Sequence, residues 1–72
     1  MRAIITVTKM KVMRCDYKIT YVKGAKRMSR EFRGDSAEAA AQAVEMASRG
    51  DSIIVASSDV MQHVPSEYGG KA

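Results

Sequence analysis

The stretch that decides the fold reads GDSAEAAAQAVEMASRG and runs from Gly34 to Gly50. It is rich in Ala and free of internal Gly and Pro, so its helix propensity is the strongest in the chain. Asp35 is placed to cap the N-terminus, and Glu38 is placed to accept from the backbone N–H of that cap. Gly50 is expected to end the helix in the left-handed conformation. The sequence therefore predicts one helix over Ser36–Arg49.

Small apolar side chains recur at helical spacing in this segment and predict the face that packs on a sheet. They are Ala37, Ala40, Ala41, Val44 and Ala47. The opposite face is expected to carry Glu38, Gln42, Glu45 and Arg49.

The rest of the chain predicts strands and turns, from β-branched content and period-two alternation. The expected strands are Ala3–Thr8, Asp16–Lys23, Arg27–Arg33, Ser52–Ala56 and Val60–Val64. The continuous apolar run of Ser52–Ala56 is typical of a strand that is central or covered on both faces. Arg30 shares a face with Met28 and Phe32, so it is expected near the sheet edge or with its stem on apolar surface.

Connections follow from turn residues and from one ambiguous segment. Residues 9–14 either continue the first strand to Val12 or form a basic loop, and a strand that frays into a loop is favoured. Gly24 is expected to allow a tight reversal. Ser57-Ser58-Asp59 predicts a turn before a closing hairpin, which Pro65 would end. Residues 66–72 are expected to form a frayed tail.

The predicted order is β-β-β-α-β-β, which makes an α+β two-layer fold with one helix packed on a largely antiparallel sheet. Residues 1–72 are expected to form a single domain. A chain of 72 residues buries a small core, so a partner or a second copy of the chain, as a homodimer, is expected to add stability.

Charge divides unevenly along the chain. Residues 1–33 hold ten Lys or Arg against two acidic residues, a net charge of +8, whereas residues 34–72 hold two against six, a net charge of −4. Such asymmetry favours a charged partner. The residues expected to bind that partner are Lys9, Lys11, Arg14, Lys18, Lys23, Lys26, Arg27 and Arg33.

The sequence shows no catalytic or metal-binding pattern, so a non-enzymatic protein without a cofactor is expected. His63 is the only histidine, and Cys15 is the only cysteine, which excludes an internal disulfide and a Cys-based zinc site. No apolar run reaches the length of a membrane span, and the N-terminus has no cleavage pattern, so a cytoplasmic protein is expected. The basic half, with Tyr17 or Tyr21 to stack a base, also fits nucleic-acid binding. The other interpretation is a solvated charged face.

Several segments resemble small phage anti-CRISPR proteins of the type I-F group. These are the Thr-rich strand Ile5–Thr8, the Tyr-containing strand Tyr17–Thr20, the helix Ala37–Ala47, the run Ile53–Ser57 and the segment Val60–Glu67. The resemblance implies an inhibitor that binds the RNA-guided surveillance complex in the cytoplasm of the infected bacterial host. It implies that target-DNA capture or nuclease recruitment is blocked, through protein subunits, guide RNA or target DNA.

Two alternatives stay open. One is a small basic nucleic-acid-binding module of phage or plasmid origin, which would lose affinity steeply with salt. The other is a small dimeric structural protein.

Overall fold

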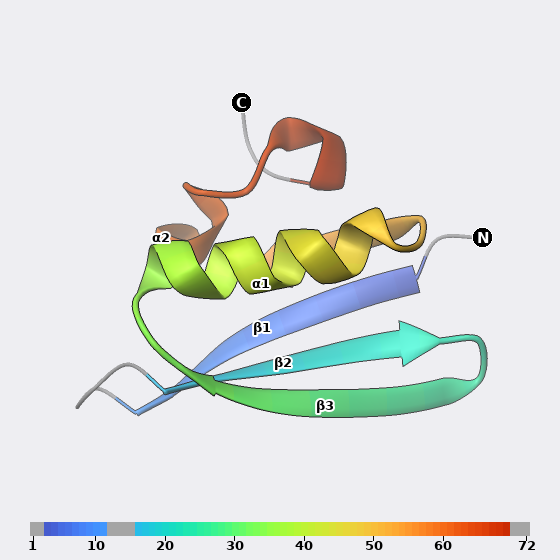
Figure 1. The fold of residues 1–72 in the computed structure, drawn as a ribbon, viewed down its shortest axis with the longest axis horizontal. Coiled ribbons are helices and arrows are strands. Elements are labelled where there is room, and N and C mark those ends of the chain that lie inside the picture. Colours follow the sequence, from blue (N-terminus) through green and yellow to red (C-terminus); the bar gives the residue numbers. More distant parts are fainter. Residues whose placement is uncertain (1–2, 12–15, 70–72) are drawn as a thin grey trace.

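The computed structural model describes residues 3–11 and 16–69. Its elements are strands β1 (Ala3–Lys11), β2 (Asp16–Lys23), β3 (Lys26–Arg33) and β4 (Ser52–Ala56), with helix α1 (Ser36–Ser48) between β3 and β4. A short helix α2 (Ser58–Met61) and a 3₁₀ helix η1 (Ser66–Tyr68) follow β4. The expected α+β fold is confirmed, because α1 packs on one face of a mostly antiparallel sheet (Figure 1). None of the described helices is long and apolar enough to cross a membrane.

The four strands lie in the order β3-β2-β1-β4. The pairs β1–β2 and β2–β3 are antiparallel, whereas β4 runs parallel to β1. The prediction of a central or doubly covered fourth strand is wrong, because β4 lies at the sheet edge. Its side chains alternate as at any half-covered strand: Ile54 is 1% exposed on the core side, whereas Val55 is 50% exposed.

The core lies between α1 and the sheet. It contains Ile5, Val7, Tyr17, Ile19, Ala39, Ala40, Ala43, Ala47, Ile54, Val60 and Val64. The predicted helix face is only partly right, since Ala37 and Ala41 are exposed and Val44 is half-buried. The buried stripe is turned toward Ala39 and Ala43, because α1 packs against α2 as well as against the sheet.

The predicted start of α1 is confirmed, but its predicted end differs. The Glu38 N–H donates to Asp35 Oδ1 at 2.8 Å, and the Asp35 N–H donates to Glu38 Oε1 at 3.4 Å. At the other end, Arg49 is the cap with φ −82°, and Gly50 is not left-handed. The last turn tightens instead, with the Gly50 N–H donating to Ala47 O at 3.2 Å, and such a bond satisfies a terminal carbonyl without a left-handed residue.

The closing hairpin is also a wrong prediction, because Ser58–Met61 is helical. Val60 lies in α2 and Val64 lies after its end, and both are buried, without the alternation that a strand would show. The first part of the expected tail forms η1, and Gly69 ends it at φ 99°. Residues 70–72 lie outside the described residues.

The sheet has one covered face and one open face. Side chains of Ile5, Val7, Tyr17 and Ile19 point toward α1, so the alternate side chains point to the other face, which none of the described elements covers. The first strand continues to Lys11, past the predicted Thr8, with a register shift between Lys9 and Lys11. Residues 12–15 lie outside the described residues.

Candidate binding surface

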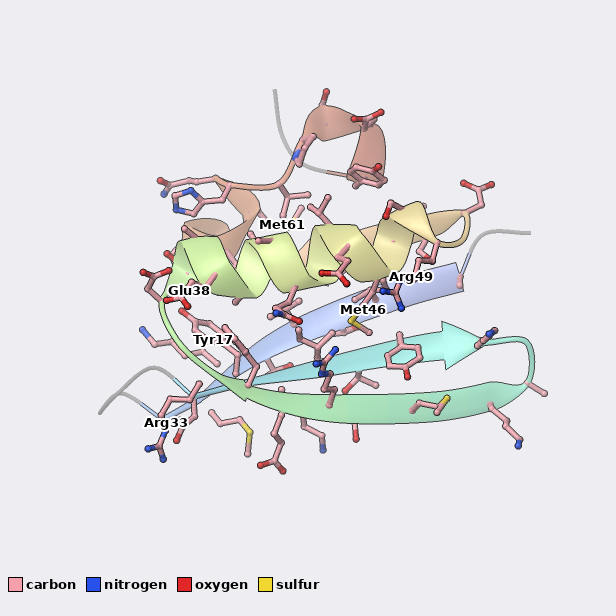
Figure 2. All side chains as sticks on the ribbon, in the orientation of Figure 1. Tyr17, Arg33, Glu38, Met46, Arg49 and Met61 are labelled. Carbon is pink, nitrogen blue, oxygen red and sulfur yellow. The ribbon has the colours of Figure 1, made fainter. Side chains whose placement is uncertain are left out.

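The basic half of the chain forms the β1–β2–β3 meander, so its charge collects on one side of the molecule. Strands β2 and β3 hold Lys18, Lys23, Lys26, Arg27, Arg30 and Arg33, all of them exposed. Helix α1 is acidic, with Glu38 and Glu45 as its charged residues. A partner that meets the β2–β3 hairpin therefore meets positive charge (Figure 2).

Three of the predicted binding residues meet at the β2–β3 turn, and we call Lys23, Lys26 and Arg27 the turn cluster. Lys23 pairs with Lys26 across a two-residue turn, and Gly24 there has φ 63°, which favours glycine. A Cβ added at Gly24 would meet nothing within 4 Å. Among the described residues no carboxylate pairs with the turn cluster, so its charges face water.

The other predicted residues do not join the turn cluster. Lys9 pairs with Tyr17 at the far end of β2, about 20 Å from the turn at about 3.3 Å per residue. Arg33 lies at that far end too, where its Nε donates to Asp16 Oδ1 at 2.9 Å. Lys18 lies between the two ends on the open face. Lys11 is described only through its backbone in β1, and Arg14 lies outside the described residues.

Lys9 is exposed, and its charge is felt by Asp59 of α2. The Ser57 hydroxyl donates to Asp59 and lowers the pKa of that carboxyl, and the positive charge of Lys9 lowers it further. The hydroxyl of the buried Tyr17 on β2 lies 3.5 Å from Asp59 Oδ2. Asp59 therefore links α2 to Tyr17 of the sheet.

A groove of about 350 Å³ lies between the end of α1 and the β2–β3 hairpin. Its apolar lining includes Ile5, Tyr21 and Met46, and its charged lining includes Lys23, Arg30, Arg49 and Asp51. Met46 and Arg49 lie at the same end of α1 in Figure 2. Sequence reasoning left Arg30 and Arg49 out of the binding set. The position of Arg30 between Met28 and Phe32 was the available signal, because it places Arg30 on the helix side.

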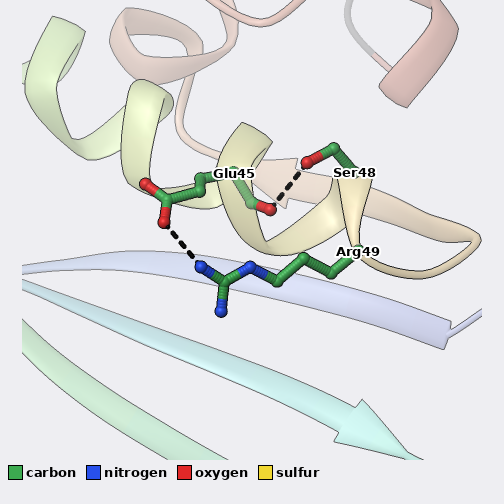
Figure 3. A network of polar contacts seen from close by, with 3 residues as sticks. All are labelled: Glu45, Ser48 and Arg49. Carbon is green, nitrogen blue, oxygen red and sulfur yellow. Dashed lines mark hydrogen bonds and ion pairs between the residues drawn. The ribbon is translucent and has the colours of Figure 1, made fainter.

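Arg49 is held beside the groove by the last turn of α1. Its Nη2 donates to Glu45 Oε1 at 2.9 Å, and the Ser48 hydroxyl donates to Glu45 O at 2.8 Å (Figure 3). The side chains of this ion pair are 76% and 62% exposed, so the pair contributes little stability. It orients the guanidinium more than it strengthens the fold.

The aromatic residues are not arranged as a base-stacking surface. Tyr17 is 1% exposed, so its ring cannot reach a base. Tyr21 is half-buried and lines the groove, on the face toward α1. On the open face, the described residues of β1 and β2 are aliphatic, polar or charged, such as Thr6, Lys18 and Thr20. Among the described residues, the open face of β1 and β2 therefore offers cations and apolar contacts, without the aromatic side chains on which single-strand binders stack bases.

In the part of the chain that the structure describes, no three His, Cys, Asp or Glu side chains come together as a metal site. His63 is exposed after α2. Comparison of the chain with protein families, with characterised proteins and with solved structures gave no match. Charge and groove geometry are therefore the observations that bear on function.

Proposed function

We propose that the protein is a non-enzymatic inhibitor that binds an acidic surface of a protein partner through its β2–β3 hairpin. The proposed partner is the RNA-guided surveillance complex of a type I CRISPR system, and the proposed effect is a block of target-DNA capture or nuclease recruitment. The turn cluster supports this proposal, because three exposed cations lie there without a carboxylate partner among the described residues.

Physical reasoning favours a partner over a purely structural role for these cations. Like charges close together repel one another, and exposed charges add little to the free energy of folding. A negatively charged surface would turn that repulsion into attraction and would speed association. The sign of the charge disfavours a mimic of DNA.

A free nucleic-acid-binding module is the second candidate, and cations on both faces of the hairpin favour it. Lys18 and Arg27 are placed toward the open face, whereas Lys23 and Lys26 are placed toward the helix side. The burial of Tyr17 weighs against this candidate, because non-specific single-strand binding relies on aromatic stacking as well as on charge.

Capture of a type I surveillance complex from bacterial lysate by the tagged protein tests the first proposal. The triple substitution Lys23→Glu, Lys26→Glu and Arg27→Glu should abolish capture at low salt and leave the fold intact. The comparison is Glu38→Lys with Glu45→Lys on α1, which removes one capping bond and the ion pair with Arg49 but keeps the turn cluster; once shown to be folded, it should retain capture. Capture by a folded triple variant at the parental level would contradict the proposal. A mobility shift of naked DNA that vanishes with salt, without capture of the complex, would favour the second candidate.

A further inference from the structure

Strand β3 presents a long outer edge. It is the outermost strand of the sheet, and no strand of the described chain pairs with its outer side (Figure 1). All residues of β3 are exposed except Phe32, which is half-buried. Proteins commonly cover or shorten such edges, because unpaired backbone groups there can bind another strand.

The register shows which backbone groups of β3 are free to bond outward. Lys23 and Lys26 close a two-residue turn, so they form a hydrogen-bonded pair of the ladder. Pairs alternate along antiparallel strands, so Met28 and Arg30 also bond inward to β2. The backbone N–H and C=O groups of the alternate residues therefore point away from the sheet. These residues are Arg27, Ser29, Glu31 and Arg33.

The charged side chains along this edge are predominantly cationic. The strand holds four cations and one anion, which gives it a net charge of +3. The cations are Lys26, Arg27, Arg30 and Arg33, and the anion is Glu31. Met28 adds an apolar contact, since it is 45% exposed on the helix side, where Arg30 lines the groove. The edge thus combines free backbone groups with positive charge and one apolar anchor point.

We propose that β3 accepts an extended acidic segment of a partner protein as a fifth strand of the sheet. The segment would exchange backbone hydrogen bonds with Ser29 and Glu31, and its alternate carboxylates would lie on the helix side, beside Lys26 and Arg30. This inference rests on the proposed function, and it adds the mode of binding and the chemistry of the bound segment. Strand addition derives affinity from the main chain and specificity from alternate side chains.

Charge argues against a second copy of this chain as the occupant. Pairing of β3 with β3 of another copy would bring two strands of charge +3 side by side. The two strands repel each other through their net charge, and other registers, such as one centred on Arg30, place like charges directly opposite each other, which destabilises cross-strand pairs. An acidic segment meets the same edge with attraction at its four cationic positions.

The first test uses a capped synthetic peptide of alternating Glu and Val residues, labelled with a fluorophore. Anisotropy at low ionic strength should show that it binds the parent protein, and rising salt should weaken that binding. A peptide of alternating Lys and Val is the matched control and should not bind. Failure of the acidic peptide to bind at about millimolar concentration, or equal binding of the Lys peptide, would overturn the proposal.

The second test separates strand pairing from charge attraction. Ser29→Pro removes an outward N–H and no bond to β2, a position where an edge strand tolerates proline. It should weaken peptide binding at least tenfold, whereas Ser29→Ala should bind as the parent does. Hydrogen exchange on the parent needs no variant: peptide should slow exchange at the amides of Ser29 and Glu31 and leave Met28 and Arg30 unchanged.

The outcomes also separate this inference from the proposed function. Unchanged binding by a folded Ser29→Pro variant, or unchanged exchange at Ser29 and Glu31 in saturated parent protein, would overturn strand addition. If the Lys23, Lys26 and Arg27 substitutions still abolish capture of the surveillance complex in that case, the proposed function stands and the strand mode alone fails. If the charge substitutions also leave capture intact, both fail.

Discussion

At the scale of single residues, Ala43 and Ala41 differ in burial alone. Ala43 is 0% exposed in the core between α1 and the sheet, whereas Ala41 on the same helix faces water. Ala43→Asp buries an unpaired carboxylate and should cost about 3 kcal/mol or more, most of the stability of so small a domain. Ala41→Asp should cost less than about 1 kcal/mol, the difference in helix propensity. Urea unfolding of both variants measures this, and equal losses would contradict the burial assignment.

Asp59 should make stability depend on pH in the acid range. Its pKa is lowered in the folded state, chiefly by the Ser57 hydroxyl, so the carboxylate favours the fold above the unfolded pKa of about 3.9. This contribution is lost as the pH falls through the folded pKa. Urea unfolding at neutral and acid pH should therefore show that Asp59→Asn loses less free energy of unfolding at acid pH than the parent does.

Ser57→Ala is the control for that measurement. It keeps the carboxylate and removes the largest cause of the lowered pKa, so it should also reduce the pH dependence. If both variants lose as much free energy of unfolding at acid pH as the parent does, the group that causes the pH dependence lies elsewhere.

At the scale of elements, the capping box fixes where α1 begins. Asp35→Ala removes the acceptor of the Glu38 N–H and should cost about 1 kcal/mol. Glu45→Ala is the comparison, because it removes an exposed ion pair with Arg49 worth about 0.3–0.5 kcal/mol. Thermal unfolding should rank Asp35→Ala as the less stable variant. The reverse order would show that the cap bonds contribute less than the geometry indicates.

Local signals predicted α1 and the β2–β3 hairpin well, because caps, alternation and Gly24 act within a few residues. The buried stripe of α1 was not predictable from spacing, since Ala occupies so many positions that several faces look alike. Val60–Val64 was predicted as a strand, whereas the structure places Val60 and Met61 in the short helix α2 and Val64 beyond its end. The place of β4 at an edge depends on tertiary pairing that no local pattern records.

The candidate surface was likewise predictable where it depends on sequence neighbours and not where it depends on packing. The turn cluster follows from sequence neighbours, so Lys23, Lys26 and Arg27 were found. The groove joins Arg30 of β3 to Arg49 at the end of α1, and only the packing of α1 on the sheet brings them to one place. Lys9 was assigned to a partner, but the structure also places its charge near Asp59.

At the scale of the whole molecule, the uneven charge should make stability increase with salt. The cations of the hairpin repel one another, and the Debye length falls from about 30 Å to about 8 Å between 0.01 M and 0.15 M ionic strength. The free energy of unfolding in urea should therefore rise over this range of sodium chloride. Lys23→Gln with Lys26→Gln should show a smaller rise, and an unchanged salt dependence would mean that the turn cluster is not the source.

The opposite edge of the sheet, strand β4, is covered by η1 and is not open as β3 is. A Cβ placed at Gly69 would come within 3.2 Å of Ile54 O and 2.9 Å of the Ile53 side chain, so the chain itself lies against this edge. A sheet with one covered edge cannot polymerise by pairing with further copies at both edges. Each molecule can therefore accept only one added strand. Titration calorimetry should give a stoichiometry of one acidic segment per chain. Concentrated protein should also stay free of fibrils.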